Sequence, residues 1–526
     1  MRRSKWVTLG LPILLLAAVL GVVGYFILFP GWGYFHSDCA DTILWAQAAY
    51  DAGALLNPDF EYACLLPFGA QLLMLPFIGL FGLSTTTQAI GMILFVLLLA
   101  GAAFWLARTM GWSVGWCAAA VAVPLLVVCG SEKLREIFFL HAIYYTLGCL
   151  FLLVGLALVN RLWRAVETPG GTPVIWLELT GAWCLLCALN GLPSLVLFSL
   201  PLLGAVVLER FFDSRTPLFS GNNRQILLLV ALGLVTTLLG LAMGDLIANG
   251  IVAGYEDAYS TFSGSGNWVD NLLGLFPAWI QLLGGDVKDG TAFLSADGIL
   301  GLIRVAFALV LGILPVVMLF FYKRFDRGLR LLLLAHWVQT ALVVFAFVFG
   351  RLSAANWRLS PVVFTAALLA VGFCRYLFRE RAGIRWGGLV LAAVVAFCGI
   401  NAVTVLRMPH DYKQDTGMNG LADFLVENDL TYGYADFWSA SVLTVLSDSQ
   451  VKVRNIKVED GEIKKYTYQQ EKSWYRQQET DEHYFLLLSK AEYQELEKAE
   501  SPVLAQATGQ LTYEGYVILP MENSLF

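Results

Sequence analysis

Long apolar runs separated by short polar segments dominate the chain as far as residue 406. A hydrocarbon layer about 30 Å thick needs about 20 apolar residues in one helix. Runs of about this length predict eleven membrane-spanning helices, at 7–29, 85–107, 113–130, 139–159, 174–190, 192–209, 225–248, 300–321, 331–350, 360–377 and 386–406. Turn residues at Asn190–Pro193 split the run 174–209, so a tight helical hairpin is predicted there.

A twelfth apolar run, Leu65–Leu83, is interrupted by Pro67, Gln71 and Pro76, and we expect it to lie at the membrane interface. Loop charges favour this choice. With a cytoplasmic N-terminus, the inside loops hold seventeen Lys and Arg residues and the outside loops six. A twelfth span would place most of these basic loops outside. We therefore expect a multi-pass cell-membrane protein whose first helix is retained rather than cleaved as a signal peptide.

The chain changes character at Arg407. Its last 120 residues hold 20 acidic and 11 basic residues, a net charge of −9, whereas the whole chain carries −6. Helical and strand periodicities alternate in this tail, which indicates a small α/β layer. Helices are predicted at 421–430, 438–446 and 491–500, and strands at 431–435, 451–454, 483–488 and 516–519. The expected fold is thus a helical membrane domain, 1–406, followed by an extracytoplasmic α/β domain, 407–526.

Composition narrows the function classes. Of the 526 residues, 58% are hydrophobic and 14% charged, against roughly 45–50% and 25% in soluble domains. This composition and the negative net charge exclude a cytosolic enzyme, a nucleic-acid binder and a disordered protein. The chain has no P-loop, HExxH or GxSxG motif.

Two long outside loops are predicted, at 30–84 and 250–299, and long loops in a compact membrane body are usually functional. The first carries Asp38 and Asp41, which share one face if they lie on a helical turn. Two carboxylates facing the same way raise a proton affinity, which a bound cation or use as a base would relieve. The alternative is a helix start, in which Ser37 or Asp38 caps and Asp41 favours the helix dipole.

A short outside loop directly after the third predicted span holds Glu132, Lys133, Arg135 and Glu136, and His141 follows at the start of a buried helix. A solvated loop neutralised by its own basic residues explains Glu132. Glu136 and His141 fit a functional site as well as they fit a solvated loop, because ionisable groups at the start of a membrane helix are costly to bury.

Arg351 and Arg358 stand close together in a later outside loop, next to Trp357. A guanidinium group pairs a phosphate through two hydrogen bonds, so this pair suits an anionic lipid head group. Interfacial anchoring of the arginines beside a belt tryptophan is the alternative. In the tail, Trp438, Trp474 and Tyr475 are of the type that stacks on sugar rings, or they belong to the core.

The chain resembles the GT-C superfamily of integral-membrane glycosyltransferases, the group of protein O-mannosyltransferases and aminoarabinose transferases. The shared features are a first span followed at once by a long acidic outside loop, a second acidic outside loop, a later long one and an outside C-terminal domain. Three short segments add to the likeness: Pro58–Tyr62, Leu66–Gly69 and Tyr432–Trp438.

The resemblance implies roles for the candidate residues. Asp38, or Asp41 as the second candidate, activates the acceptor; Glu136 helps to hold a cation or the donor; Arg351 or Arg358 binds the lipid phosphate. Protein O-mannosyltransferases carry adjacent Asp and Glu residues in the first loop, whereas here two Asp stand three apart. The identity of the base and the need for a divalent cation therefore stay open.

We accordingly expect an enzyme that moves a sugar from a polyprenyl-phosphate donor to a glycan, lipid or protein acceptor outside the membrane. Such a reaction needs a base on the acceptor hydroxyl and positive charge at the departing phosphate. The alternative is a transporter or flippase of lipid-linked sugars, but no internal repeat is evident and Asp245 is the only acid well placed for a transport path. A sensor whose tail binds wall polymer ranks last, because eleven spans exceed what an anchor needs.

Overall fold

The computed structural model describes residues 9–213, 224–251, 261–351, 355–380, 383–411, 417–475 and 483–526. Within these ranges nine helices are long and apolar enough to cross a membrane. They are α1 (Leu11–Leu28), α4 (Thr85–Thr109), α7 (Tyr144–Glu167), α9 to α10 (Leu192–Phe212), α11 (Arg224–Ala248), α14 (Ala296–Phe320), α15 (Arg327–Phe349), α16 with the turn before it (Asn356–Arg379) and α17 (Ile384–Leu406).

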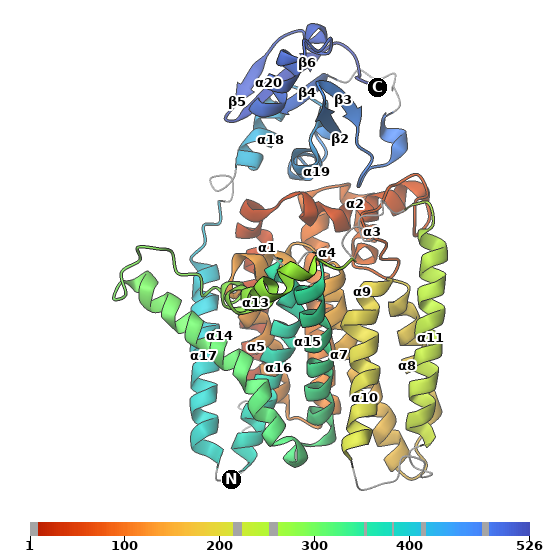
Figure 1. Ribbon diagram of the computed structural model, residues 1–526, viewed down its shortest axis with the longest axis vertical. Helices are drawn as coiled ribbons and strands as arrows, with labels where there is room; N and C mark the ends of the chain where they lie inside the picture. Colours follow the sequence, from red (N-terminus) through yellow and green to blue (C-terminus); the bar gives the residue numbers. More distant parts are fainter. Residues whose placement is uncertain are drawn as a thin grey trace.

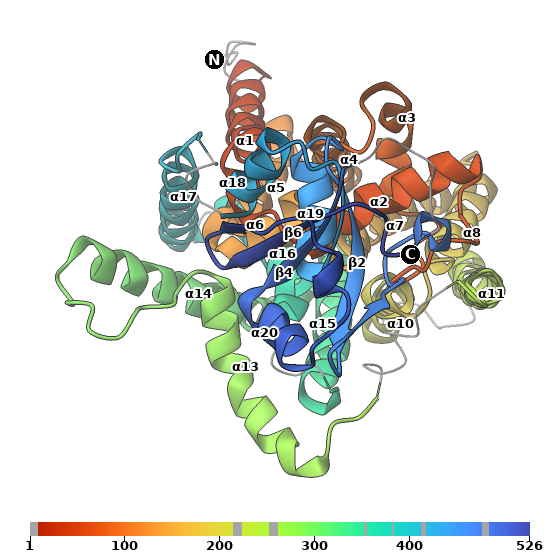
Figure 2. The same ribbon diagram turned by 90° about the horizontal axis from the view of Figure 1, so that it is seen from above.

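The two remaining predicted spans are also helical but shorter. They are α5, extended by one turn to Val114–Gly130, and α8 (Pro173–Ala188). The predicted hairpin after α8 forms through Gly191, whose φ of 74° lies in the left-handed region that glycine tolerates. The interrupted run Leu65–Leu83 yields only α3 (Gln71–Phe81), which is too short to cross a bilayer and lies near α2 (Ser37–Ala52) at the upper end of the bundle (Figures 1 and 2). The prediction of a helical polytopic membrane protein is thus confirmed.

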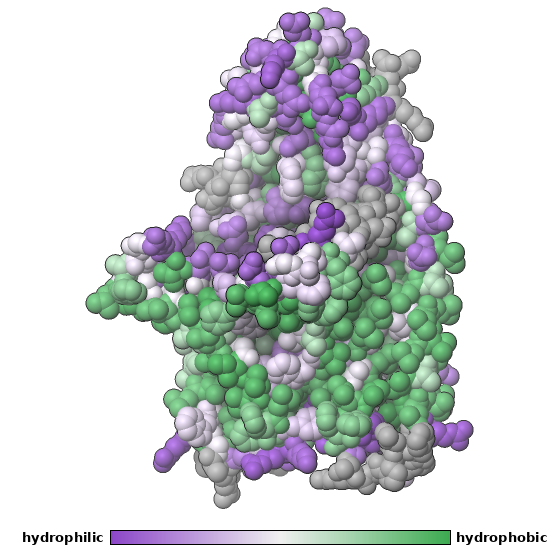
Figure 3. Space-filling view, in the orientation of Figure 1, coloured by the Kyte–Doolittle hydropathy of each residue, from purple (hydrophilic) through white to green (hydrophobic). Residues whose placement is uncertain are grey.

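The surface of the molecule fits this reading. Apolar side chains form a belt around the helical bundle, with polar side chains at its lower end and over the C-terminal unit above it (Figure 3). Helix α1 leads into the upper end of the bundle, where α2 lies, and the C-terminus lies in the upper unit (Figure 1). The protein therefore spans the membrane several times.

The C-terminal unit is built on a six-stranded sheet with the strand order β3-β2-β1-β4-β6-β5. Strand β1 pairs in parallel with β2 and β4, and the other pairs are antiparallel. The strands are β1 (Tyr432–Ala435), β2 (Lys452–Glu459), β3 (Glu462–Lys465), β4 (Tyr484–Ser489), β5 (Leu511–Tyr513) and β6 (Tyr516–Met521). The four strands that the sequence predicts are present; it does not predict β3 and β5, which are short and mostly polar.

Helices cover both faces of this sheet. Leu425 of α18 (Gly417–Glu427) and Leu443 of α19 (Phe437–Leu446) pack with Phe485 on the face toward the membrane. Leu496 of α20 (Lys490–Lys498) packs with Leu486 on the other face. The alternating apolar positions of the central strands thus build one core on each face, as period-two side-chain alternation requires.

The segment between α1 and α4 and the C-terminal unit are hydrogen-bonded together. The backbone N–H of Glu61 donates to the Gln470 carbonyl at 3.0 Å, and the Gln469 N–H donates to the Glu61 carbonyl at 2.8 Å. At the start of α2, the Ser37 hydroxyl lies 2.8 Å from the carbonyl oxygens of both Phe437 and Trp438. The C-terminal unit therefore sits directly on the loop that carries the candidate acids.

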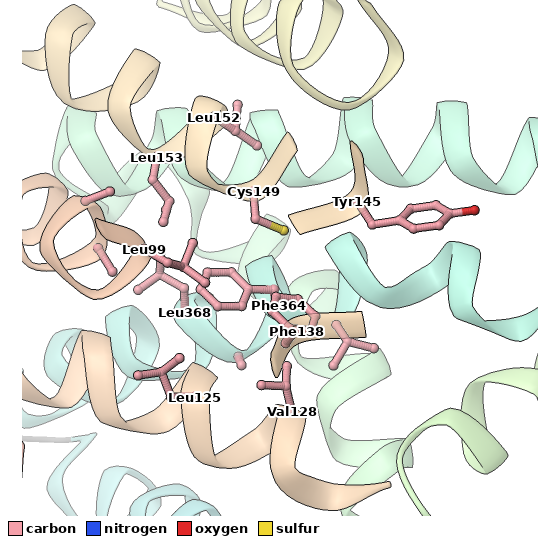
Figure 4. Close-up of a cluster of buried hydrophobic side chains, with 14 of the residues drawn as sticks. Leu99, Leu125, Val128, Phe138, Tyr145, Cys149, Leu152, Leu153, Phe364 and Leu368 are labelled. Atoms are coloured by element: carbon pink, nitrogen blue, oxygen red, sulfur yellow. The ribbon is translucent and has the colours of Figure 1, made fainter. Parts of the chain in front are cut away.

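Below this junction, α6 (Glu132–Phe139) is anchored in the bundle by its apolar side. The ring of Phe138 stacks on Phe364 of α16, with 5.4 Å between ring centroids, amid leucines of α4, α5 and α7 (Figure 4). Tyr145 of α7 borders the same cluster, but its ring points out of it (Figure 4). Apolar contacts thus hold α6 in the bundle, although Arg135 and Glu136 of this helix are also buried.

Gly433 tests the packing of the C-terminal sheet. A Cβ atom at this position would lie 2.2 Å from the Phe485 ring, so Gly433→Ala must displace a buried aromatic side chain. We expect a loss of about 1–3 kcal/mol of stability, seen as faster limited proteolysis of the C-terminal unit. Gly509→Ala is the control, because nothing lies within 4 Å of that added atom. Equal proteolysis of the two variants would contradict this account.

Candidate active site

Asp38 and Asp41 lie on the first turns of α2, as the helical spacing predicts. The capping alternative is not supported, because the residue before the helix is His36 and no side chain caps this helix start. Ser37 instead donates to the C-terminal unit. Asp38 does lie in the first turn, where a carboxylate interacts favourably with the helix dipole.

The two aspartates have different surroundings. The side chain of Asp38 is 49% exposed, whereas the Oδ1 atom of Asp41 is enclosed and has no hydrogen-bond partner. Burial raises the pKa of Asp41 well above its usual range, the Asp38 carboxylate raises this pKa further, and Gln469 and His36 oppose the shift. Asp41 therefore holds its proton more tightly than a solvated aspartate does.

Glu136 is the centre of a buried ionic cluster. Its side chain is 8% exposed. Its Oε1 atom lies 3.2 Å from His36 Nε2 and 3.4 Å from His141 Nε2, and its Oε2 atom lies 2.5 Å from Lys133 Nζ. Burial by itself raises the pKa of Glu136, but the contacts with His141 and His36 outweigh it and hold this pKa below its usual range. Glu136 is thus a carboxylate that stays ionised inside the protein.

His36, which the sequence does not single out as a site residue, joins the two acidic groups. Its Nδ1 atom lies 4.0 Å from Asp38 Oδ2, while its Nε2 atom contacts Glu136. Burial lowers the pKa of His36, but Cys39 and the Glu136 carboxylate raise it to about 11. A position two residues before Asp38 is the only signal for this role that the sequence offers.

The α2 helix is held against this cluster by Gln88 of α4. The buried Gln88 amide donates to the Leu140 carbonyl at 2.6 Å and lies 3.2 Å from the Cys39 carbonyl. One side chain thereby fixes α2 relative to the break between α6 and α7, where His141 lies.

Arg358 approaches the same region from the turn before α16. The Lys133 ammonium lies 5.0 Å above the ring of Trp357, which connects the Glu136 cluster to this turn. Arg358 is half-buried beside Tyr144 and Tyr145. Its Nη1 atom lies 3.4 Å from the Ala346 carbonyl.

Arg351 is differently placed. Its side chain is exposed at the end of α15, and its backbone N–H donates to the Thr261 carbonyl at 3.2 Å. The structure thus brings together Asp38, Glu136, His141 and the turn that carries Arg358. It leaves Arg351 on the exposed segment beyond α15.

The sequence leaves open whether a divalent cation takes part, so we looked for a group of metal ligands among the described residues. Among the residues that the structure describes, no group of three or more His, Cys, Asp or Glu side chains is arranged to hold a metal ion. The contacts of Glu136 explain this locally, because its carboxylate oxygens are already engaged by two histidines and a lysine.

An apolar groove lies in the bundle below these residues. Its volume is about 380 Å³. It is lined by residues before and in α3 and by residues of α4, α7 and α8, among them Phe68, Leu98, Trp105, Leu147 and Trp183. Leu147 lies one turn of α7 after Tyr144, which is beside Arg358. A hydrocarbon chain in the groove would therefore end near a guanidinium group.

The pH dependence of stability tests the His36–Glu136 contact. The stabilisation from a raised His36 pKa is complete below about pH 6.5 and is lost as the pH rises toward 11. The stabilisation that comes from the lowered Glu136 pKa is present above about pH 4.5 and is lost at lower pH. We expect the melting temperature of the wild type to fall more between pH 6.5 and 10 than that of Glu136→Gln. The exposed Glu132→Gln, on the same helix, should follow the wild type; parallel curves for all three proteins would refute the contact.

Comparison with known proteins gives a match at the level of structure. No family model and no curated protein sequence matches the chain. The crystal structure of ArnT from Cupriavidus metallidurans bound to undecaprenyl phosphate is similar over 97% of both chains, with 14% identity and a TM-score of 0.50. The apo structure of the same protein gives 15% identity and a TM-score of 0.49 over the same shares. The chain therefore shares the fold of ArnT over nearly its whole length.

Proposed function

We propose that the protein is a membrane glycosyltransferase that moves a sugar from a polyprenyl-phosphate donor to an acceptor on the extracytoplasmic side. The observation that carries this proposal is the row of contacts from Asp38 through His36, Glu136 and Lys133 to the turn of Arg358, together with an apolar groove in the same helical bundle. The shared fold adds support, since the ArnT crystal structure holds undecaprenyl phosphate.

Asp38 is the proposed base. The acceptor oxygen attacks the anomeric carbon as Asp38 takes its proton, and the bond between that carbon and the phosphate oxygen breaks. Asp41 is less suited to this role, because burial raises its pKa and favours the protonated form. We therefore resolve the two candidates in favour of the exposed Asp38, with Asp41 as a neutral neighbour.

Arg358 is the proposed phosphate ligand. The departing phosphate gains negative charge in the transition state, and a fixed guanidinium group stabilises it most where water is partly excluded. Arg358 is half-buried near the groove, whereas Arg351 is exposed. The groove supplies the apolar surface that the first isoprene units of a polyprenyl chain require.

Glu136 and His141 are proposed to act at one remove from the substrates. The Glu136 carboxylate holds Lys133 and His36 in place and so fixes the charges around the donor phosphate and Asp38. This role replaces direct binding of a cation or of the donor, because Glu136 is buried and already engaged. His141, 3% exposed, supports Glu136 from below.

The site also bears on orientation. Helix α2, which carries Asp38, and the C-terminal unit lie at the same end of the bundle (Figure 1). With the basic loops on the cytoplasmic side, we place both the site and the domain 407–526 outside.

The structure gives no support to the transporter alternative. Its candidate acid, Asp245, is exposed on α11, which lies at the edge of the bundle (Figure 2).

Replacement of the two aspartates tests the assignment of the base. Asp38→Asn should lower the transfer rate at least about 100-fold, because general-base catalysis contributes about 10²–10⁴. Asp41→Asn should stay within about tenfold of the wild type, since the amide resembles the protonated acid that burial favours. Transfer is followed by glycan analysis in a deletion strain complemented with each variant, at matched membrane expression. Full activity of Asp38→Asn would reject the proposal.

Replacement of the two arginines tests the phosphate contact. Arg358→Gln should reduce kcat/KM for a synthetic polyprenyl-phosphate sugar by about 10- to 100-fold, since a hydrogen bond to a charged group contributes about 1.5–3 kcal/mol. Arg351→Gln is the matched variant, and its effect should stay below about threefold because its side chain is exposed. A larger loss in Arg351→Gln than in Arg358→Gln would reverse the assignment.

A further inference from the structure

A second hollow, of about 390 Å³, opens between the first outside loop and the C-terminal sheet. Asp38 lies in its lining, together with Asp436, Phe437 and Trp438 at the start of α19 and residues of β2. It is separate from the apolar groove, which has no lining residue in common with it. The proposed base thus faces a space bordered by the C-terminal unit.

The lining is rich in aromatic rings in mutual contact. Phe437 packs against Trp438 and Tyr468, with centroids 5.1 Å and 5.2 Å apart, and Tyr468 stacks on Tyr466 at 5.6 Å. The ammonium of Lys457 lies 4.0 Å above the Tyr466 ring. This row of rings gives the hollow a firm apolar wall.

Trp438 stands out in this wall because it is 59% exposed. Of the three aromatic residues that the sequence suggests for sugar stacking, Tyr475 is 2% exposed and belongs to the core, and Trp474 is covered by the Arg454 guanidinium at 4.0 Å. A large ring left exposed beside a hollow is a typical feature of a binding surface.

The charges of the lining residues restrict the chemical class of the ligand further. Asp38, Asp436, Glu459 and Glu492 line the hollow, against the single basic residue Lys457. The Asp436 carboxylate accepts a hydrogen bond from the Ser439 N–H at the start of α19, and the Glu492 carboxylate accepts one from the N–H of Ser489, the residue that caps α20. Both acids are therefore held in place by the fold. This excess of negative charge disfavours an anionic ligand.

We propose that this hollow is the acceptor subsite and that it takes a neutral sugar chain, stacked on Trp438 with a hydroxyl directed at Asp38. The inference rests on the proposed function and specifies its acceptor class. Sugar rings have apolar faces that stack on aromatic side chains and hydroxyls that bond to carboxylates, which matches this combination of groups.

Saturation-transfer NMR on the full-length protein in nanodiscs tests the proposal, with cellotetraose as the neutral probe and tetragalacturonate as the anionic one. The wild type should bind cellotetraose, and Trp438→Ala should weaken this binding about five- to tenfold, the value of one aromatic stack. Tyr50→Ala, which removes a 51% exposed ring on α2 outside the hollow, should have no effect. Absence of cellotetraose binding, or equal binding by Trp438→Ala and the wild type, would overturn the proposal.

The anionic probe tests the charge argument. Tetragalacturonate should bind more weakly than cellotetraose to the wild type, and Glu459→Lys should reduce this difference without changing the fold, because Glu459 is paired only at the surface with Lys464. Stronger binding of tetragalacturonate to the wild type would overturn the inference.

A parallel titration with undecaprenyl phosphate separates the two proposals. Trp438→Ala should bind this lipid as the wild type does. If this variant binds both the lipid and cellotetraose as the wild type does, the acceptor subsite alone is rejected. If the wild type transfers no sugar from a polyprenyl-phosphate donor, the proposed function is rejected.

Discussion

Burial of one ionised carboxylate constrains the upper end of this membrane bundle. An isolated carboxylate cannot be withdrawn from water without a cost of several kcal/mol, so Glu136 must be paired on every side that it presents. Its partners come from three places: His36 before α2, Lys133 on α6 and His141 at the break before α7. The need to neutralise Glu136 therefore joins the segment before α2 to α6 and to the start of α7, and it fixes the position of Asp38.

The C-terminal unit is part of the same construction. Gln469 shows this most clearly: its side-chain oxygen accepts a hydrogen bond of 2.8 Å from the Trp45 indole of α2, and its backbone pairs with Glu61. Its φ of 57° is unusual for a residue other than glycine, and the surrounding contacts hold it there. A soluble unit tied so closely to α2 positions the second wall of the hollow that Asp38 faces.

The division of the site into two spaces follows from this arrangement. The apolar groove is built by membrane helices and is lined mostly by leucine, phenylalanine and tryptophan. The second hollow is built by aromatic and acidic residues of a soluble layer. The proposed lipid-linked donor and water-exposed acceptor would need these two different surroundings, and the proposed base Asp38 lines the second of them.

The sequence by itself determined the eleven helices, the hairpin at Gly191, the interfacial run and most of the C-terminal strands, because each depends on apolar periodicity and turn residues within a short stretch. It also nominated Asp38, Asp41, Glu136, His141, Arg351 and Arg358 as candidate site residues, since charges beside membrane helices are costly and few. Only the tertiary structure decided that the Asp38 side chain is half-exposed while the Asp41 Oδ1 atom is enclosed, that His36 links two acids, and that Trp438 rather than Tyr475 is exposed and able to stack. Those properties depend on segments hundreds of residues apart, whose contacts decide burial and pairing and which local periodicity does not encode.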